Sequence, residues 1–112
     1  RCQGWYPLRA GAGLVRLEDI AHAVDGSMKI FVDGGIRSGT DVFKAIALGA
    51  DAVMIARPFV TAVYGGGREG VKSYIDKIGG ELEDTMKMCG VSSLREITRD
   101  CVWTPHDHTI SF

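Results

Sequence analysis

The segment that most constrains the fold of this chain covers residues 31–58 and reads FVDGGIRSGTDVFKAIALGADAVMIARP. Residues 29–32, which overlap the start of this segment, are rich in β-branched and aromatic side chains and predict a short strand. Residues 52–55 are continuously apolar, which is typical of a parallel strand covered on both faces. The stretch between them has the period of a helix. We therefore expect a right-handed βαβ unit that brings the carboxyl ends of two parallel strands to one edge of a sheet.

The connecting helix carries its own start and stop signals. Ser38 can cap its first turn, and Asp41 lies near the positive end of the helix dipole. Gly49 suits the left-handed position that commonly ends a helix. The buried face is expected to consist of apolar side chains at helical spacing, namely Val42, Phe43, Ile46 and Ala47.

Further helices are expected on either side of this unit. Residues 14–24 carry an apolar stripe at helical spacing, and the turn at residues 25–27 ends it. Downstream, residues 59–64 form a short apolar segment that is followed by three glycines. A long helix is then expected over about residues 69–88, with Gly90 ending it.

The long helix is expected to bury one stripe of side chains that recur every three or four residues: Val71, Tyr74, Ile75, Ile78, Leu82, Thr85 and Met86. Gly79 and Gly80 lie inside this helix, and each should weaken it by about 1 kcal/mol relative to alanine. A short helix is expected next. It starts at Ser92 or Ser93, with Glu96 placed to complete a capping box with Ser93.

Both predicted strands end in segments suited to binding an anion. A Gly-Gly pair after the first strand lets the backbone approach a ligand without an intervening Cβ. Backbone N–H groups at such strand ends and at helix N-termini favour an anion. Each arginine can also make paired hydrogen bonds to phosphate oxygens. The alternative is a plain turn with solvated arginines, but two adjacent basic strand ends favour a phosphate site. The candidate residues are Asp33, Gly34, Gly35, Ile36, Arg37, Ala56 and Arg57.

Length and composition limit the possible architectures and partners. At 112 residues the chain is too short for a whole (β/α)₈ barrel, which needs roughly 250. A formal charge of -1 provides no basic field, so nucleic acid is not an expected partner. The longest apolar runs are too short to cross a bilayer, so no membrane association is expected. Cys2, Cys89 and Cys101 form no Cys-x-x-Cys motif, which predicts inert, reduced thiols in a cytoplasmic protein.

Residues 33–50, followed by Ala56, Arg57 and Pro58, resemble the C-terminal part of the FMN-dependent α-hydroxy acid oxidases and dehydrogenases, a family that includes the lactate and glycolate oxidases. The stretch ELEDTMKMCG at residues 81–90 and the following SLREI resemble the last barrel helix of that family. The resemblance runs from about Leu17 to Trp103.

This resemblance implies an α/β fold that is the C-terminal portion of an FMN-binding (β/α)₈ TIM barrel, comprising the last two strands and the helices that follow them. Residues 14–103 are then a partial barrel domain. Residues 1–13 form an irregular segment without family pattern, and residues 104–112 form a tail.

The resemblance also implies cofactor-binding roles. In the family, the Asp-Gly-Gly-x-Arg strand end holds the ribityl chain and phosphate of FMN, and this corresponds to residues 33–37 here. A Gly-Arg pair after the last strand also binds the phosphate, and here it reads Ala56-Arg57. The alanine retains its backbone N–H, so phosphate binding is expected to survive unless this position needs a positive φ.

No catalytic and no metal-binding residue is expected in this chain. The family takes its catalytic base from a His in a Ser-Asn-His-Gly-Gly-Arg segment, whose neighbouring Arg binds the substrate carboxylate. Residues 3–13 contain no such segment. His22 is expected on the exposed face of its helix. His106 and His108 are expected in a solvated tail, since a metal site there would need further ligands.

By resemblance, the expected function is FMN-dependent oxidation of a small 2-hydroxy acid to a 2-oxo acid, with this chain carrying the FMN-phosphate-binding part and being inactive alone. Exposed strand edges predict self-association. Three alternatives remain open: another phosphate-binding barrel enzyme, such as an inosine-monophosphate-dehydrogenase-like or type 2 isopentenyl-diphosphate-isomerase-like protein, a non-catalytic flavin-binding half barrel, and a non-functional remnant. The helical pattern of residues 81–97 argues against the first.

Overall fold

The structure, a computed structural model, describes residues 17–102. The predicted segments at residues 1–13 and 104–112, the first residues of the helix expected from residue 14, and His106 and His108 lie outside the described range. The elements are, in chain order, α2 (Leu17–Val24), β1 (Phe31–Asp33), α3 (Gly39–Ala47), β2 (Ala52–Met54), α4 (Arg57–Cys89) and two short 3₁₀ turns, η1 (Leu94–Glu96) and η2 (Arg99–Cys101).

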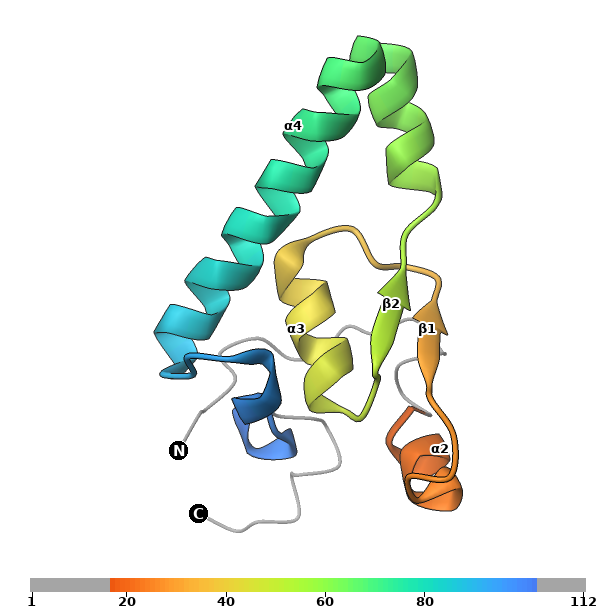
Figure 1. Ribbon diagram of the computed structural model, residues 1–112, viewed down its shortest axis with the longest axis vertical. Helices are drawn as coiled ribbons and strands as arrows, with labels where there is room; N and C mark the ends of the chain where they lie inside the picture. Colours follow the sequence, from red (N-terminus) through yellow and green to blue (C-terminus); the bar gives the residue numbers. More distant parts are fainter. Residues whose placement is uncertain (1–16, 103–112) are drawn as a thin grey trace, which may run out of the picture.

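The two strands pair in parallel, with α3 as the crossover between them, so the predicted βαβ unit is confirmed. Val32 lies opposite Val53 in the register. α3 lies between the strands on one side and the long arm of α4 on the other (Figure 1). Both strands are only three residues long. β1 starts two residues later than expected, and β2 ends one residue earlier.

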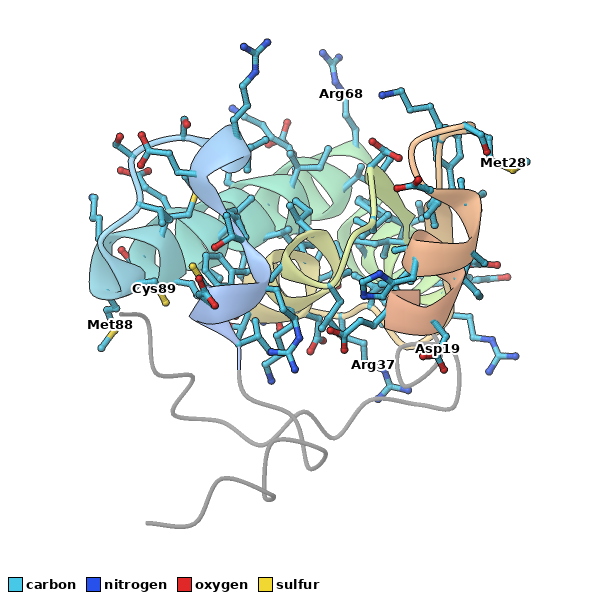
Figure 2. All side chains as sticks on the ribbon, turned by 90° about the horizontal axis from the view of Figure 1, so that it is seen from below. Asp19, Met28, Arg37, Arg68, Met88 and Cys89 are labelled. Carbon is cyan, nitrogen blue, oxygen red and sulfur yellow. The ribbon has the colours of Figure 1, made fainter. Side chains whose placement is uncertain are left out.

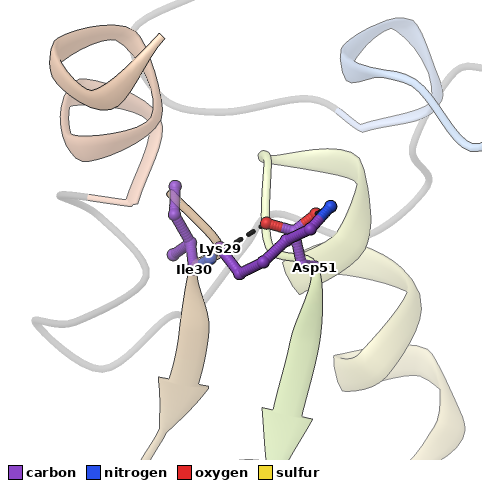
Figure 3. A network of polar contacts seen from close by, with 3 residues as sticks. All are labelled: Lys29, Ile30 and Asp51. Carbon is purple, nitrogen blue, oxygen red and sulfur yellow. Dashed lines mark hydrogen bonds and ion pairs between the residues drawn. The ribbon is translucent and has the colours of Figure 1, made fainter. Parts of the chain in front are cut away.

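Asp51 closes the amino end of the strand pair (Figure 3). Its Oδ2 accepts a hydrogen bond from the backbone N–H of Ile30 at 2.9 Å, and its Oδ1 lies 3.5 Å from the Lys29 ammonium. The Ile30 carbonyl in turn accepts from the backbone N–H of Asp51 at 2.9 Å and of Ala52 at 3.3 Å. Residues 29 and 30, which were expected in the strand, therefore bind to Asp51 instead of entering the regular ladder.

α3 begins and ends as its sequence signals predict. The Ser38 side chain caps the helix by accepting from the Asp41 backbone N–H at 3.3 Å. Gly49 has a φ of +118°, which is the positive value expected just after the helix. The expected face is buried at Val42, Phe43 and Ala47 and partly buried at Ile46, and Phe43 is the largest fully buried side chain of the described residues.

The first residue of α3 touches the backbone of α4. A Cβ added at Gly39 would overlap the Leu82 amide nitrogen and crowd the Ile78 carbonyl oxygen. One hydroxyl pair supports the same contact, because the side chains of Thr40 and Thr85 lie 3.2 Å apart. Only a glycine allows the two helices to approach this closely, so Gly39 fixes where α3 meets the long arm of α4.

α4 is a helical hairpin, and its second arm is the long helix that was expected over about residues 69–88. Residues 57–66 form a first helical arm, Gly67 has the non-helical angles φ 56° and ψ -134°, and residues 68–89 form the second arm (Figure 1). No helix was predicted for residues 59–64, which lie in the first arm. Pro58 is in the first turn of that arm, where its missing N–H costs nothing. Gly90, with a φ of 73°, ends α4 as predicted.

The turns after α4 differ from the predicted capping box. Glu96 accepts hydrogen bonds from both the backbone N–H and the hydroxyl of Ser92, each at 3.0 Å. Ser93 is the N-cap residue of η1 but makes no side-chain cap bond. Glu96 therefore pairs with Ser92 and not with Ser93, and the expected short helix is a single 3₁₀ turn.

The outer surface of the strand pair is uncovered within the described residues. Phe31 is 64% exposed and Met54 is 53% exposed, so the expectation that the second strand is covered on both faces is not met by residues 17–102 themselves. Cys89 and Cys101 are not in a disulfide with each other, in line with the predicted reduced thiols. In this part of the chain, no helix has the length and apolar character needed to span a membrane.

Asp51→Asn tests the closure of the strand pair. The Ile30 N–H and the Lys29 ammonium hold the pKa of the Asp51 carboxyl below its ordinary value, so the ionised form is stabilised by folding. Its contribution is present above pH 4 and is lost as the pH falls through the lowered pKa. We expect Asp51→Asn to lower the free energy of unfolding at pH 7, with the difference shrinking at pH 3. Urea unfolding followed by circular dichroism measures this, and Asp76→Asn on the exposed side of α4 is the control.

A matched glycine pair tests the contact between α3 and α4. Gly39→Ala should destabilise the fold by about 1–3 kcal/mol, because the methyl group must displace helix backbone. Gly79→Ala should instead stabilise it by about 0.4–1 kcal/mol, since nothing lies within 4 Å of a Cβ there. Equal effects of the two substitutions in urea unfolding would contradict the close approach at Gly39.

Candidate anion-binding site

The turn after β1 leaves its backbone open to a ligand. Gly34 and Gly35 have φ values of +98° and +76°, which side chains other than glycine rarely adopt. No described atom lies within 4 Å of a Cβ built at either position. Asp33, the last residue of β1, is also exposed. This turn therefore combines a backbone that requires glycine with free space beside it.

The next two side chains differ in burial: Ile36 is buried in the core and Arg37 is exposed to solvent. The Ile36 side chain is 3% exposed and belongs to the core, so a ligand could reach only its backbone. The Arg37 backbone is held on both sides: its N–H donates to Asp41 Oδ2 at 3.1 Å, and its carbonyl accepts from the Tyr74 hydroxyl at 2.6 Å. Its side chain extends outward, on the side of the molecule away from Arg68 (Figure 2). The guanidinium is therefore exposed on a fixed backbone.

The end of β2 passes directly into α4. Ala56 is the N-cap residue with a φ of -118°, an angle that alanine adopts without strain. Its carbonyl accepts from the backbone N–H groups of Phe59 at 3.0 Å and Val60 at 3.2 Å. Arg57 follows as the first residue of the helix, and its side chain is exposed.

The two arginines line one hollow of about 660 Å³ between the arms of α4. This volume lies in the range of small-molecule sites. The first arm contributes residues from one helical face: Arg57, Pro58, Thr61, Ala62, Gly65 and Gly66. Because β1 and β2 are parallel neighbours, Arg37 reaches the same hollow from the end of the adjacent strand.

The second arm supplies the facing wall with Gly70, Ser73, Tyr74 and Lys77. Their spacing of three and four residues places all of them on one side of the helix. At Gly70 a Cβ would overlap the Ala62 carbonyl oxygen, so the arms touch there. The Phe59 and Tyr74 rings also meet edge to face, with centroids 5.0 Å apart and planes at 86°. The hollow is therefore built on a closely packed hairpin.

The charged side chains that line the hollow are all cations. Arg37, Arg57 and Lys77 line it, and no carboxylate does. Within residues 17–102, the ion pairs join Lys29 to Asp51, Lys87 to Glu83 and Arg99 to Glu18, so none of the three lining cations forms an ion pair with a described carboxylate. Burial, together with Glu81 and Asp41, raises the pKa of Tyr74, so its hydroxyl stays protonated and keeps donating to Arg37 at neutral pH. The arrangement is suited to an anion.

The sequence indicated part of this site and missed the rest. Of the seven predicted residues, Arg37 and Arg57 line the hollow and the other five do not. Tyr74 was assigned only to a buried stripe, and Ser73 and Lys77 were not singled out. Positions 73 and 77 lie beside and one turn beyond Tyr74, so helical spacing could have found them once the hairpin was known. His22 is exposed on α2, as expected.

The chain is similar to known proteins over most of its length. The family model described as FMN-dependent dehydrogenase matches residues 9–104. The chain is 48% identical over 98 residues to the peroxisomal (S)-2-hydroxy-acid oxidase GLO4 of Oryza sativa subsp. japonica, covering 88% of this chain and 27% of that protein. It is 44% identical over 96 residues to glycolate oxidase 3 of Arabidopsis thaliana, covering 86% of this chain and 26% of that protein.

Solved structures show the same similarity. Mandelate oxidase with benzoyl-formic acid superposes with a TM-score of 0.76 at 41% identity, covering 80% of this chain and 27% of that one. A flavocytochrome b2 variant superposes with a TM-score of 0.75 at 36% identity, covering 79% of this chain and 24% of that one. The chain thus spans about a quarter of the length of the proteins it matches. Several relatives have "peroxisomal" in their names, and the cytoplasmic location remains a prediction.

Tyr74→Phe tests how the hairpin holds the turn after β1. The substitution removes the hydrogen bond to the Arg37 carbonyl and keeps the ring contact with Phe59. We expect a loss of about 0.5–1.5 kcal/mol in the free energy of unfolding. Tyr64→Phe is the matched control, because Tyr64 is 89% exposed. Equal unfolding midpoints for the two variants in urea would show that the bond does not stabilise the fold.

Proposed function

The chain belongs to the FMN-dependent dehydrogenase family, and on that premise we propose that it forms the phosphate-binding end of an FMN site in an oxidase or dehydrogenase of 2-hydroxy acids. One observation carries the proposal. Parallel pairing of β1 and β2 brings Arg37 and Arg57 to a single hollow that no described carboxylate lines. One arginine side chain can donate two parallel hydrogen bonds to phosphate oxygens, and such charge-assisted hydrogen bonds are among the strongest in proteins.

We propose further that residues 14–103 form the last two strands and following helices of a (β/α)₈ barrel. The parallel strand pair with a helical crossover is the repeating unit of that fold. Phe31 and Met54 are exposed on strands that such a barrel would cover. The relatives are about four times as long as the matched region, which leaves ample chain for the other strands.

The described residues fit the phosphate end of FMN. Gly34 and Gly35 offer backbone beside open space, and a side chain at either position would intrude on it. Arg37 and Arg57 would hold the phosphate oxygens, with the backbone N–H groups of Ile36 and Ala56 near them. Asp33, at the end of β1, would contact the ribityl chain. When bound, FMN supplies the capacity to accept a hydride equivalent from the substrate.

The contribution of these residues is to bind and orient the cofactor. A base that removes a substrate proton must lie within hydrogen-bond reach of the reacting group. The histidine among residues 17–102 is His22, which is exposed on α2 and does not line the hollow. We therefore propose that the catalytic base and the substrate-binding arginine come from outside the described residues.

The proposed substrate is a small 2-hydroxy acid, which follows from the names of the relatives. These relatives are a (S)-2-hydroxy-acid oxidase and a glycolate oxidase. We propose that the exposed strand pair self-associates when the remaining strands are absent, since unpaired strand edges readily add further strands. Turnover then requires that these strands and their catalytic groups be supplied.

A non-catalytic flavin-binding module is the second candidate. The position of His22 favours it, because the hollow contains no described side chain that could act as a base near neutral pH. Both candidates require that Arg37 and Arg57 bind the phosphate of FMN. Saturable FMN binding without turnover of glycolate or lactate by the 112-residue chain favours the module, whereas turnover favours the enzyme.

Binding of FMN and of riboflavin, which lacks the phosphate, tests the proposal. We expect the chain to prefer FMN, and Arg37→Gln or Arg57→Gln to weaken FMN binding roughly 10- to 100-fold while leaving riboflavin binding unchanged. This range corresponds to about 1.5–3 kcal/mol for a hydrogen bond to a charged group. Arg68→Gln is the control, since Arg68 does not line the hollow and points away from Arg37 (Figure 2). Quenching of flavin fluorescence measures both affinities. Equal affinities for FMN and riboflavin in the unmodified chain would overturn the proposal.

A further inference from the structure

Lys77 lines the same hollow from the second arm of α4 and was not indicated by any sequence motif. We propose that Lys77 is a third cationic contact for the phosphate group of FMN. This inference rests on the proposed function and adds one residue to it. Lysine binds phosphate as a compact point charge on a flexible stem, so it can reach an anion without the fixed geometry that arginine requires.

The position of Lys77 along α4 places it beside the proposed phosphate site. Tyr74, three residues before it, donates its hydroxyl to the Arg37 carbonyl. Ile78, one residue after it, packs its carbonyl against Gly39 at the start of α3. Lys77 therefore lies at the level where the turn after β1 passes into α3. Residues three apart are neighbours on a helix face, so Lys77 and Tyr74 point to the same side.

The local charges leave Lys77 available to an anion. Glu81 is the acidic residue four positions further along the helix, where it could pair with Lys77. No ion pair joins the two, and Glu81 Oε1 is buried without a hydrogen-bond partner among the described residues. Asp76 is adjacent in sequence, and adjacent residues do not face each other on a helix.

Three cations around one hollow repel each other unless an anion lies between them. A phosphate monoester carries between one and a half and two negative charges near pH 7. Two arginines and one lysine can therefore surround such a group without a large excess of positive charge. A carboxylate would neutralise only one of the three, so the set favours a phosphate over a carboxylate.

A Lys77→Gln variant of the 112-residue chain tests the inference through the affinities for FMN and riboflavin. We expect about three- to tenfold weaker FMN binding at low salt, the range for a solvent-accessible charged contact, and unchanged riboflavin binding. The loss should shrink at 0.5 M salt because exposed charges are screened. Lys77→Arg should restore most of the affinity. Lys72→Gln is the matched control, with the same loss of charge on the same helix at a position that does not line the hollow.

The outcomes separate this inference from the proposed function. If the unmodified chain prefers FMN to riboflavin and Lys77→Gln binds FMN as tightly as Lys72→Gln does, Lys77 is a solvated side chain and the inference is wrong. If the unmodified chain shows no preference for FMN, both the proposed phosphate site and the role of Lys77 are overturned. Equal losses for FMN and riboflavin in Lys77→Gln would also reject it, because the phosphate would not be the group contacted.

Discussion

The parallel pairing of β1 with β2 is the constraint on which the rest of the structure depends. It is closed at the amino ends by the Asp51 carboxylate and the Ile30 backbone, and it opens at the carboxyl ends into two basic segments. Because parallel strands point the same way, anything that follows either strand must lie at one edge. The proximity of Arg37 and Arg57 is therefore a consequence of strand direction.

The hairpin of α4 converts this edge into a hollow. A non-helical Gly67 reverses the chain, and the contact of Gly70 with the Ala62 carbonyl brings the two arms together. Tyr74 then joins the second arm to the turn after β1 through its hydroxyl and to the first arm through Phe59. A single side chain thus connects all the segments that line the hollow. Its contacts explain why the turn can hold glycines in open space and still be fixed.

Local signals in the sequence predicted most of the fold. The cap at Ser38, the left-handed glycines at positions 49 and 90 and the buried face of α3 depend on neighbours within a few residues, so they can be recognised without a structure. The helix after Pro58 was missed because a run of three glycines suggested an end to regular structure. The partner of Glu96 was also predicted wrongly, because Glu96 accepts from Ser92 and not from Ser93.

The sequence by itself determined the βαβ unit, because this follows from hydrophobic period and glycine positions, and its motifs carried the resemblance to the family. Only the tertiary structure decided that residues 57–89 fold back on themselves and that Lys77 faces the same hollow as Arg37. It also decided the backbone conformation at position 56, where alanine has a negative φ. The physical reason is the sequence separation of the contacts involved. Helix and strand formation depend on residues a few positions apart, whereas the hollow depends on contacts between segments some 40 residues apart, which no local pattern specifies.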